Sequence, residues 1–239
     1  GYATLRLMLE VLPHPSSLIL CDLYQKQESL ETIRVELQDD LGFSGEIRIE
    51  TTKGRLPDAV YDATFILGAT NVPGILDVER LQEGTLIVDD SFPPCFRVFD
   101  AIKRLESHHD ILFTTSGLLR LGEEIKETIY LPSGTASLLE ELGGNQLLAL
   151  AGRDAKEITG CILSGLLTGR NPDIKPTLGP VSLEDSLAHF NLLQSSEFGP
   201  ARLQCENYFI SQETIKLFNS GQSMERDLAK SPIRVQGLD

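Results

Sequence analysis

The sequence lacks tryptophan, contains few cysteines and has no long apolar run. It has no Trp, two Met and four Cys in 239 residues. No apolar stretch approaches the roughly 18 residues that a membrane-spanning helix needs, and the first residues carry no secretion signal. The cysteines form no C-x-x-C pair, and no His, Cys, Asp or Glu cluster has metal-ligand spacing, so we expect neither a metal site nor a disulfide scaffold. The sequence therefore predicts a soluble, cytoplasmic protein with reduced thiols.

Basic residues are scarce relative to acidic ones. Lys and Arg number 21 against 35 Asp and Glu, which gives a formal net charge of -14. Such a charge repels phosphate backbones and anionic membranes, so we expect no nucleic-acid partner. The hydrophobic fraction of 41% and the charged fraction of 23% are those of globular proteins. A length of 239 residues allows one large domain or two modest ones.

Residues 1–130 alternate between two hydrophobic patterns. Apolar residues recur at helical spacing from Tyr2 to Leu12, with Gly1 at the start of that helix. Short apolar or alternating runs predict strands at residues 18–21, 46–50, 63–67, 85–88 and 111–113. Helical spacing recurs between them over residues 27–41, 78–81 and 98–105. Strands that alternate with helices form βαβ units with right-handed crossovers, which predicts a parallel α/β sheet.

No strand precedes the first helix, although a βαβ unit needs one there. The missing strand would be the central one of a doubly wound sheet, and without it a ladder of buried N–H and C=O groups has no partner. We therefore expect an upstream part of the same protein to supply it. The predicted fold is a doubly wound, mostly parallel Rossmann-like α/β sheet whose first strand is missing from this chain, with a C-terminal helical extension.

The predicted strands end in polar residues or glycine. In parallel α/β sheets, ligands bind beyond the carboxyl ends of the strands. An ordinary turn explains any one of these residues, but together they have the layout of a dinucleotide site. The predicted cofactor-binding residues are Gly1, Asp22, Ala69, Thr70, Asn71, Asp90, Ser91 and Gly117.

Asp22 is the most specific of these residues. It ends a strand about 20 residues beyond Gly1, where an acidic residue accepts hydrogen bonds from both ribose hydroxyls of an adenosine. Its carboxylate would repel a 2′-phosphate, so NAD is favoured as cofactor, with NADP possible. Lys26, one helical turn later, is interpreted as a solvated lysine at a helix start. Of the G-x-G-x-x-G fingerprint, Gly1 alone is present, as a candidate third glycine.

Residues 131–219 are predicted to form a helical extension that packs on the first domain. Helical patterns cover residues 134–142 and 145–167, and Ser182 with Asp185 resembles a capping box that opens a further helix. Residues 220–239 lack periodicity and are predicted to be a loose tail.

Cys161 is the candidate catalytic residue. Its small neighbours Gly160, Ser164 and Gly165 leave room for a ligand or another backbone. A free cysteine on an apolar helical face is usually a core residue, whereas a nucleophilic thiolate needs a nearby cation or helix N-terminus. The pattern alone leaves both interpretations open. Among the other cysteines, Cys21 is predicted to be a core residue and Cys95 a loop thiol.

Several segments together resemble the cyanobacterial long-chain acyl-ACP reductases, which are related in fold to the shikimate and glutamyl-tRNA reductase dehydrogenases. The resemblance covers roughly residues 1–205. The similar segments are residues 1–12, 18–22, 86–93, 116–117, 160–161 and 169–171, followed by an amphipathic helix.

The resemblance implies an NAD(P)-dependent oxidoreductase that converts an acyl thioester into a fatty aldehyde. Cys161 falls where that family places its nucleophilic cysteine, and Gly117 would lie close to the nicotinamide. The implied substrate is a small molecule or an acyl group on a carrier. Asp22 departs from what an NADPH-using enzyme would prefer, which is a basic residue, and an acidic carrier protein would need a basic patch for docking.

Two alternatives stay open at the level of sequence. The first is a shikimate-dehydrogenase-like reductase of a small keto acid, in which Cys161 is a core residue. The second is a non-catalytic Rossmann module that binds a nucleotide for regulation or assembly.

Overall fold

The computed structural model describes residues 1–124, 154 and 156–226. The chain divides into two compact units, each described here by itself. The first unit comprises Gly1–Ser116 and Leu203–Asp239, and the second comprises Gly117–Arg202. We predicted a boundary after residue 130. The structure instead changes unit after Ser116, and the chain returns to the first unit at Leu203, because residues beyond Leu203 pack on the core of the first unit.

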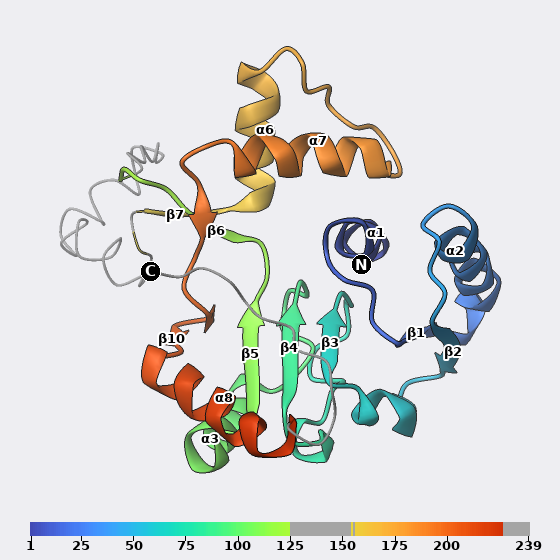
Figure 1. Cartoon of the computed structure of the whole chain (residues 1–239), viewed down its shortest axis with the longest axis vertical. Helices are drawn as coiled ribbons and strands as arrows, with labels where there is room; N and C mark the ends of the chain where they lie inside the picture. The colour runs from blue at the N-terminus through green and yellow to red at the C-terminus, as the bar shows by residue number, and fades with distance from the viewer. Residues whose placement is uncertain (125–153, 155, 227–239) are drawn as a thin grey trace, which may run out of the picture. The chain divides into compact units, whose positions relative to one another are not determined.

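The first unit contains two parallel sheets. Three strands, β3 (Phe65–Gly68), β4 (Thr85–Asp89) and β5 (Ile111–Thr115), pair in the order β3-β4-β5 and point the same way (Figure 1). Strands β1 (Ser17–Leu23) and β2 (Glu46–Thr52) form a separate parallel pair. The α/β class and the five strands are thus confirmed. The doubly wound sheet is not confirmed, because the described strands form two separate sheets and β1 and β3 share no ladder of hydrogen bonds.

Helices and short strands complete the first unit. The α-helices are α1 (Tyr2–Val11), α2 (Gln27–Asp39), α3 (Val98–His108) and α8 (Gln212–Arg226), and the 3-10 helices are η1 (Tyr24–Lys26), η2 (Asp58–Asp62) and η3 (Val78–Arg80). Strands β9 (Gln204–Cys205) and β10 (Tyr208–Phe209) form an antiparallel pair. The predicted loose tail from Ser220 is wrong as far as Arg226, which is helical. Helix α8 is fixed by packing of Ile215 and Phe218 on the core, a tertiary contact that periodicity does not reveal.

The hydrophobic core of the first unit has two clusters, and β1 contributes to both. Ile19 and Cys21 pack against the larger cluster, which contains Ile87 and Phe113 of the three-stranded sheet. Leu20 belongs to the smaller cluster with residues of α1 and α2. Because successive side chains of a strand point to opposite faces, β1 has apolar packing on both sides, as an inner strand of a parallel sheet does.

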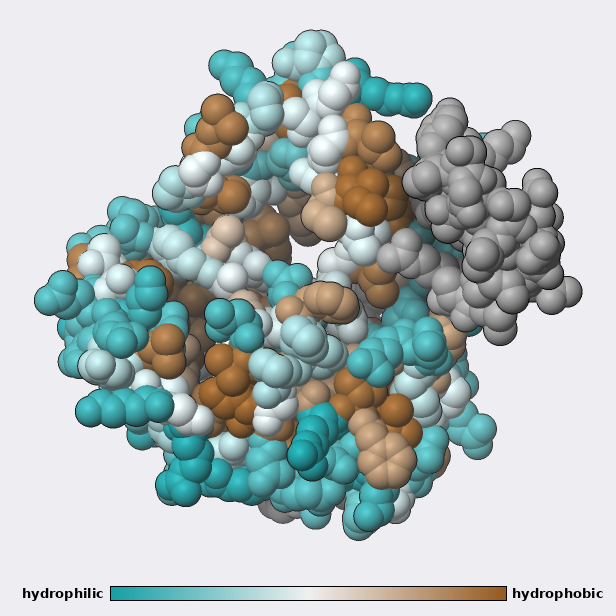
Figure 2. All heavy atoms as spheres, turned by 180° about the vertical axis from the view of Figure 1, so that it is seen from behind, coloured by the Kyte–Doolittle hydropathy of each residue, from teal (hydrophilic) through white to brown (hydrophobic). Residues whose placement is uncertain are grey.

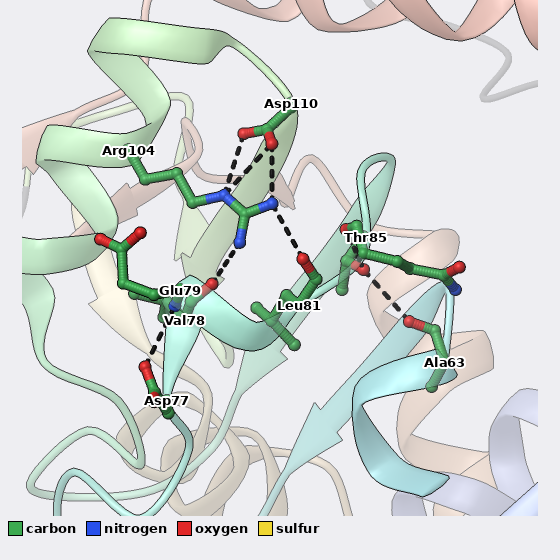
Figure 3. Close-up of polar contacts among 9 residues, drawn as sticks. Ala63, Asp77, Val78, Glu79, Leu81, Thr85, Arg104 and Asp110 are labelled. Carbon is green, nitrogen blue, oxygen red and sulfur yellow. Dashed lines mark hydrogen bonds and ion pairs between the residues drawn. The ribbon is translucent and has the colours of Figure 1, made fainter. Parts of the chain in front are cut away.

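A buried arginine ties α3 to the segment before β4. The Arg104 guanidinium binds the carboxylate of Asp110, with the closest atoms 2.7 Å apart, and also donates to the carbonyl oxygens of Val78 and Leu81 (Figure 3). The Arg104 side chain is only 8% exposed. A buried charge of this kind is tolerated because its donors are paired, so we assign Arg104 a structural role.

The second unit combines a small antiparallel sheet with two helices. Strands β6 (Leu118–Arg120), β7 (Glu157–Thr159) and β8 (Gly199–Pro200) pair in the order β7-β6-β8, and the helices are α6 (Gly160–Arg170) and α7 (Leu183–Gln194). The capping box of Ser182 and Asp185 is confirmed at the start of α7. The predicted helix over 145–167 is wrong at residues 157–159, because Ile158 pairs with Leu119 in the sheet. The predicted helix at 134–142 and the first part of that at 145–167 lie outside the described residues.

The described surface is mostly hydrophilic. Seen from behind, hydrophilic residues cover much of the described surface, and hydrophobic residues form separate patches among them (Figure 2). No helix in the described part of the chain is both long and apolar enough to cross a bilayer.

Candidate functional site

The carboxyl ends of β3 and β4 are held together by hydrogen bonds. The Asp90 N–H donates to the Gly68 carbonyl oxygen at 2.8 Å. The Thr70 N–H donates to Ser91 Oγ at 2.9 Å. The structure therefore brings the predicted residues Thr70, Asp90 and Ser91 to one edge of the three-stranded sheet, which we call the strand-end edge.

Ser116 joins the end of β5 to the same edge. Its N–H donates to the Asp89 carbonyl oxygen at 2.8 Å, and its hydroxyl donates to Asp90 Oδ1 at 2.8 Å. Asp90 is exposed, so its carboxylate faces solvent beside the three strand ends. All three parallel strands thus contribute polar groups to one edge, the arrangement in which α/β sheets bind ligands.

The Asp89 carboxylate, which sequence reasoning did not select, organises this edge from beneath. Asp89 is 1% exposed, and its two oxygens accept hydrogen bonds from the Ser91 N–H at 3.0 Å and the Cys95 N–H at 2.8 Å. Gly68 leaves room for it, since a Cβ there would lie 2.3 Å from Asp89 Oδ1. No sequence signal distinguishes Asp89, whose carboxylate accepts hydrogen bonds from the loop that follows it, from other aspartates at strand ends.

Cys95 lies in the predicted loop but is buried, at 3% exposure, within the larger core cluster. Burial and the neighbouring Asp89 carboxylate raise the pKa of its thiol far above the ordinary range. Cys205 is also fully buried, and burial likewise raises the pKa of its thiol. These two thiols are core residues.

The start of α1 lies against the end of β3. A Cβ on Gly1 would lie 3.1 Å from the Cβ of Ala69. A helix N-terminus offers unpaired N–H groups and a partial positive charge, which suit the pyrophosphate of a dinucleotide. Gly1 and Ala69 are thus neighbours, as the prediction requires. Asn71 is exposed and follows Thr70 in the same turn.

Asp22 lies at the end of the other parallel sheet of the first unit. It is exposed and precedes the last residue of β1, and its Oδ1 accepts a hydrogen bond from the Leu23 N–H at 2.7 Å. The second carboxylate oxygen accepts no hydrogen bond from the described residues. Burial, together with the charges of Asp22 and Glu50, raises the pKa of the adjacent Cys21 thiol to about 11, so that thiol stays protonated at neutral pH.

The second unit places Gly117 next to the helix that carries Cys161. The Gly160 N–H donates to the Gly117 carbonyl oxygen at 2.6 Å. Gly117 has a φ of 74°, a conformation that favours glycine. A Cβ on Gly160 would lie 3.3 Å from that carbonyl oxygen, so both glycines permit the close approach.

Cys161 is an exposed thiol in the first turn of α6. Its Sγ lies 3.3 Å from Thr159 Oγ1, to which the thiol donates. The partial positive charge at a helix N-terminus favours an anion at this position. The sequence left open whether Cys161 is a core residue or a nucleophile. The exposed side chain does not agree with a core position.

Ser164 and His189 form a pair that sequence reasoning missed. Ser164 Oγ lies 3.3 Å from His189 Nδ1, across 25 residues of chain and between α6 and α7. No spacing in the sequence signals such a pair, because it depends on how the two helices cross.

A hollow lies elsewhere in the first unit, at the start of α3. It has a volume of about 550 Å³ and contains none of the predicted cofactor residues. Its lining is Pro73, Gly74, Pro93, Pro94, Phe96, Arg97, Val98, Phe99, Asp100 and Glu206. We therefore assign the candidate site from hydrogen bonding at the strand ends and not from this hollow.

Comparison with known proteins adds no family. No protein-family model matches the chain, and no curated protein matches it either. Within the described residues, no group of three or more His, Cys, Asp or Glu side chains could hold a metal ion.

Proposed function

We propose that this protein is an NAD(P)-dependent reductase that converts an acyl thioester into an aldehyde through a covalent thioester on Cys161. The observation that carries the proposal is the exposed Cys161 thiol in the first turn of α6, beside Gly117. Cys95 and Cys205 are buried, and the Cys21 thiol stays protonated at neutral pH. Cys161 is thus the cysteine suited to nucleophilic chemistry.

The proposed reaction has two stages. The Cys161 thiolate attacks the acyl carbonyl, a C–S bond forms to Cys161, and the C–S bond to the carrier breaks to release the carrier as a thiol once it takes up a proton. A reduced nicotinamide, when bound, supplies two electrons and one hydrogen to the acyl carbon. Breakage of the Cys161–carbon bond then releases the aldehyde and regenerates the thiolate.

The strand-end edge and α1 are suited to hold the dinucleotide. The α1 N-terminus beside Ala69 would bind the pyrophosphate, and the free carboxylate oxygen of Asp22 would accept from the ribose hydroxyls. Thr70, Asn71, Asp90 and Ser91 would lie along the cofactor. Because Asp22 is negative and exposed, we propose NADH as the preferred form.

We also propose that the two parallel sheets of the first unit are parts of one doubly wound Rossmann-like sheet, with a further parallel strand between β1 and β3. Among the described strands, β1 pairs with β2 alone and β3 pairs with β4 alone, so each has one open edge. Figure 1 shows β3 as the strand of its sheet that lies nearest the β1–β2 pair. Two open edges and apolar packing on both faces of β1 support an inner position for these strands.

Removal of the Cys161 thiol tests the proposed function. In Cys161→Ala, we expect aldehyde formation from a long-chain acyl thioester and NADH to fall by about 10³-fold or more, because the nucleophile is lost. Without NADH, intact-mass measurement should show one acyl adduct on the unmodified protein and none on the variant. Cys21→Ala is the matched control and should retain both.

Two results would overturn the proposal. Undiminished reduction of the thioester by Cys161→Ala would exclude the covalent route. Binding of NADH without turnover of any acyl thioester would favour a nucleotide-binding module instead.

A further inference from the structure

The polar pair of Ser164 and His189 lies in the second unit, on the two helices α6 and α7. Both residues are half-buried, and the 3.3 Å separation of Ser164 Oγ and His189 Nδ1 is within hydrogen-bonding distance. A serine hydroxyl can donate to an imidazole nitrogen and accept another proton at the same time. The pair can therefore pass a proton in either direction.

Ser164 shares helix α6 with Cys161 and lies three residues after it. Side chains three residues apart in a helix lie on the same face, with Cβ atoms about 5–6 Å apart. Cys161 and Ser164 have this spacing in α6. The Cys161 thiol points to Thr159 in the structure, and rotation of its χ1 to another staggered position moves the sulfur away from Thr159 Oγ1.

One acidic residue of α7, Asp185, interacts with His189 through its charge. Asp185 lies one turn earlier on α7. Hydrogen bonds from Ser182 chiefly lower the pKa of Asp185, and the charge of His189 lowers it further. Ser164 from α6 contacts the His189 ring, and the charge of Asp185 from α7 acts on it. An ionised Asp185 stabilises the imidazolium that proton uptake would create.

We propose that His189 acts through Ser164 to take up the proton of Cys161 when the nucleophilic thiolate forms. The thiol proton moves to Ser164 Oγ while the hydroxyl proton of Ser164 moves to His189 Nδ1. After the thiolate has displaced the carrier from the acyl carbon, the same proton returns through Ser164 to the departing carrier sulfur. This inference rests on the proposed function, in which Cys161 is the nucleophile, and it makes His189 a positioning residue.

Alkylation of Cys161 by iodoacetamide tests the relay without any substrate or cofactor. The rate at pH 7 measures the thiolate population, while at about pH 10 an ordinary thiol is ionised without help. In His189→Gln we expect alkylation to slow by about tenfold at pH 7 and to be unchanged at pH 10. Peptide mapping by mass spectrometry assigns the label to Cys161, and His108→Gln in the first unit is the matched control.

Ser164→Ala provides the second measurement. Since His189 acts through Ser164, this variant should slow alkylation at pH 7 as much as His189→Gln does, and the double variant should be no slower than either. Equal rates at pH 7 in His189→Gln and the unmodified protein would overturn the relay. A loss of equal size at pH 7 and pH 10 would also overturn it, because it would show a merely structural role.

The two proposals fail separately. If no acyl adduct forms on Cys161 but the alkylation contrast is present, the relay stands and the thioester reaction falls. If the adduct forms equally fast in His189→Gln and the unmodified protein, the thioester reaction stands and the relay falls.

Discussion

The strand-end edge depends on a close approach of two residues, Gly68 and Asp89. The Asp89 carboxylate is buried and accepts hydrogen bonds from two backbone N–H groups. A Cβ at position 68 would lie 2.3 Å from Asp89 Oδ1 and 2.8 Å from Cys95 Sγ. Neither neighbour can move freely, since one is held by hydrogen bonds and the other is packed in the core. The glycine is therefore required by packing and not by its backbone angles.

Gly68→Ala should therefore destabilise the first unit. We expect the free energy of unfolding to fall by about 1–3 kcal/mol, the usual cost of overpacking a core. Urea denaturation followed by circular dichroism measures it. The matched control is Gly221→Ala in α8, where a Cβ would meet no atom within 4 Å. There we expect a gain of about 0.5–1 kcal/mol, because alanine is the better helix former. Equal effects at the two positions would contradict the packing argument.

At the scale of the element, the helices and strands of residues 1–116 follow from hydrophobic period, and so do α7 and most of α6. The short strands of the second unit do not. Each predicted strand from residue 18 to 113 is present, because buried parallel strands carry short apolar runs and β2 carries an alternating one. The residues of strand β7 were predicted to be helical, since Ile158 fits both the helical and the strand period. Its pairing with Leu119 makes this segment a strand. The contact of Ser164 with His189 could not be predicted, because it requires the crossing of two helices.

The small sheet of the second unit carries a network of charges. Asp154 accepts from the Lys156 N–H at 3.0 Å, and one of its oxygens lies 2.9 Å from Arg120 and 3.6 Å from Arg202. Glu157 lies 4.0 Å from the same two arginines. The network joins the two sides of the sheet, since Arg120 belongs to β6 and Arg202 follows β8.

The stability of this sheet should decrease at acidic pH. The Lys156 N–H, and then Arg120, lower the pKa of Asp154, so its contacts stabilise the fold above the ordinary aspartate value of about 3.9. That stability is lost as the pH falls through the lowered pKa. We expect the amide hydrogens of β6 and β7 to exchange faster below about pH 4 in the unmodified protein, after correction for the intrinsic rate. In Asp154→Asn, the change with pH should be smaller, and an unchanged pH dependence would contradict the assignment.

At the scale of the molecule, the predicted cofactor residues fall into three groups. The first group meets at one edge, as neighbouring parallel strands require, and consists of Gly1, Ala69, Thr70, Asn71, Asp90 and Ser91. Asp22 ends the second sheet of the same unit, and Gly117 begins the other unit. Strand direction therefore predicted the first group. The other two depend on how separate sheets and units are arranged, which a strand pattern does not encode.

Cofactor binding tests whether the two sheets of the first unit act together. A dinucleotide that reaches from Asp22 to Ser91 would contact both sheets, so NADH should raise the melting temperature, with about 2.7 kcal/mol of stabilisation at 100 times Kd. In Asp22→Ala, the ratio of the Kd values for NADPH and NADH should fall about tenfold or more, because a hydrogen bond to a charged group contributes about 1.5–3 kcal/mol. Asp39→Ala, at an exposed position of α2, should leave the ratio unchanged.

No stabilisation by either cofactor at millimolar concentration would contradict the presence of a dinucleotide site. Stabilisation with an unchanged ratio in Asp22→Ala would contradict a contact between Asp22 and the ribose.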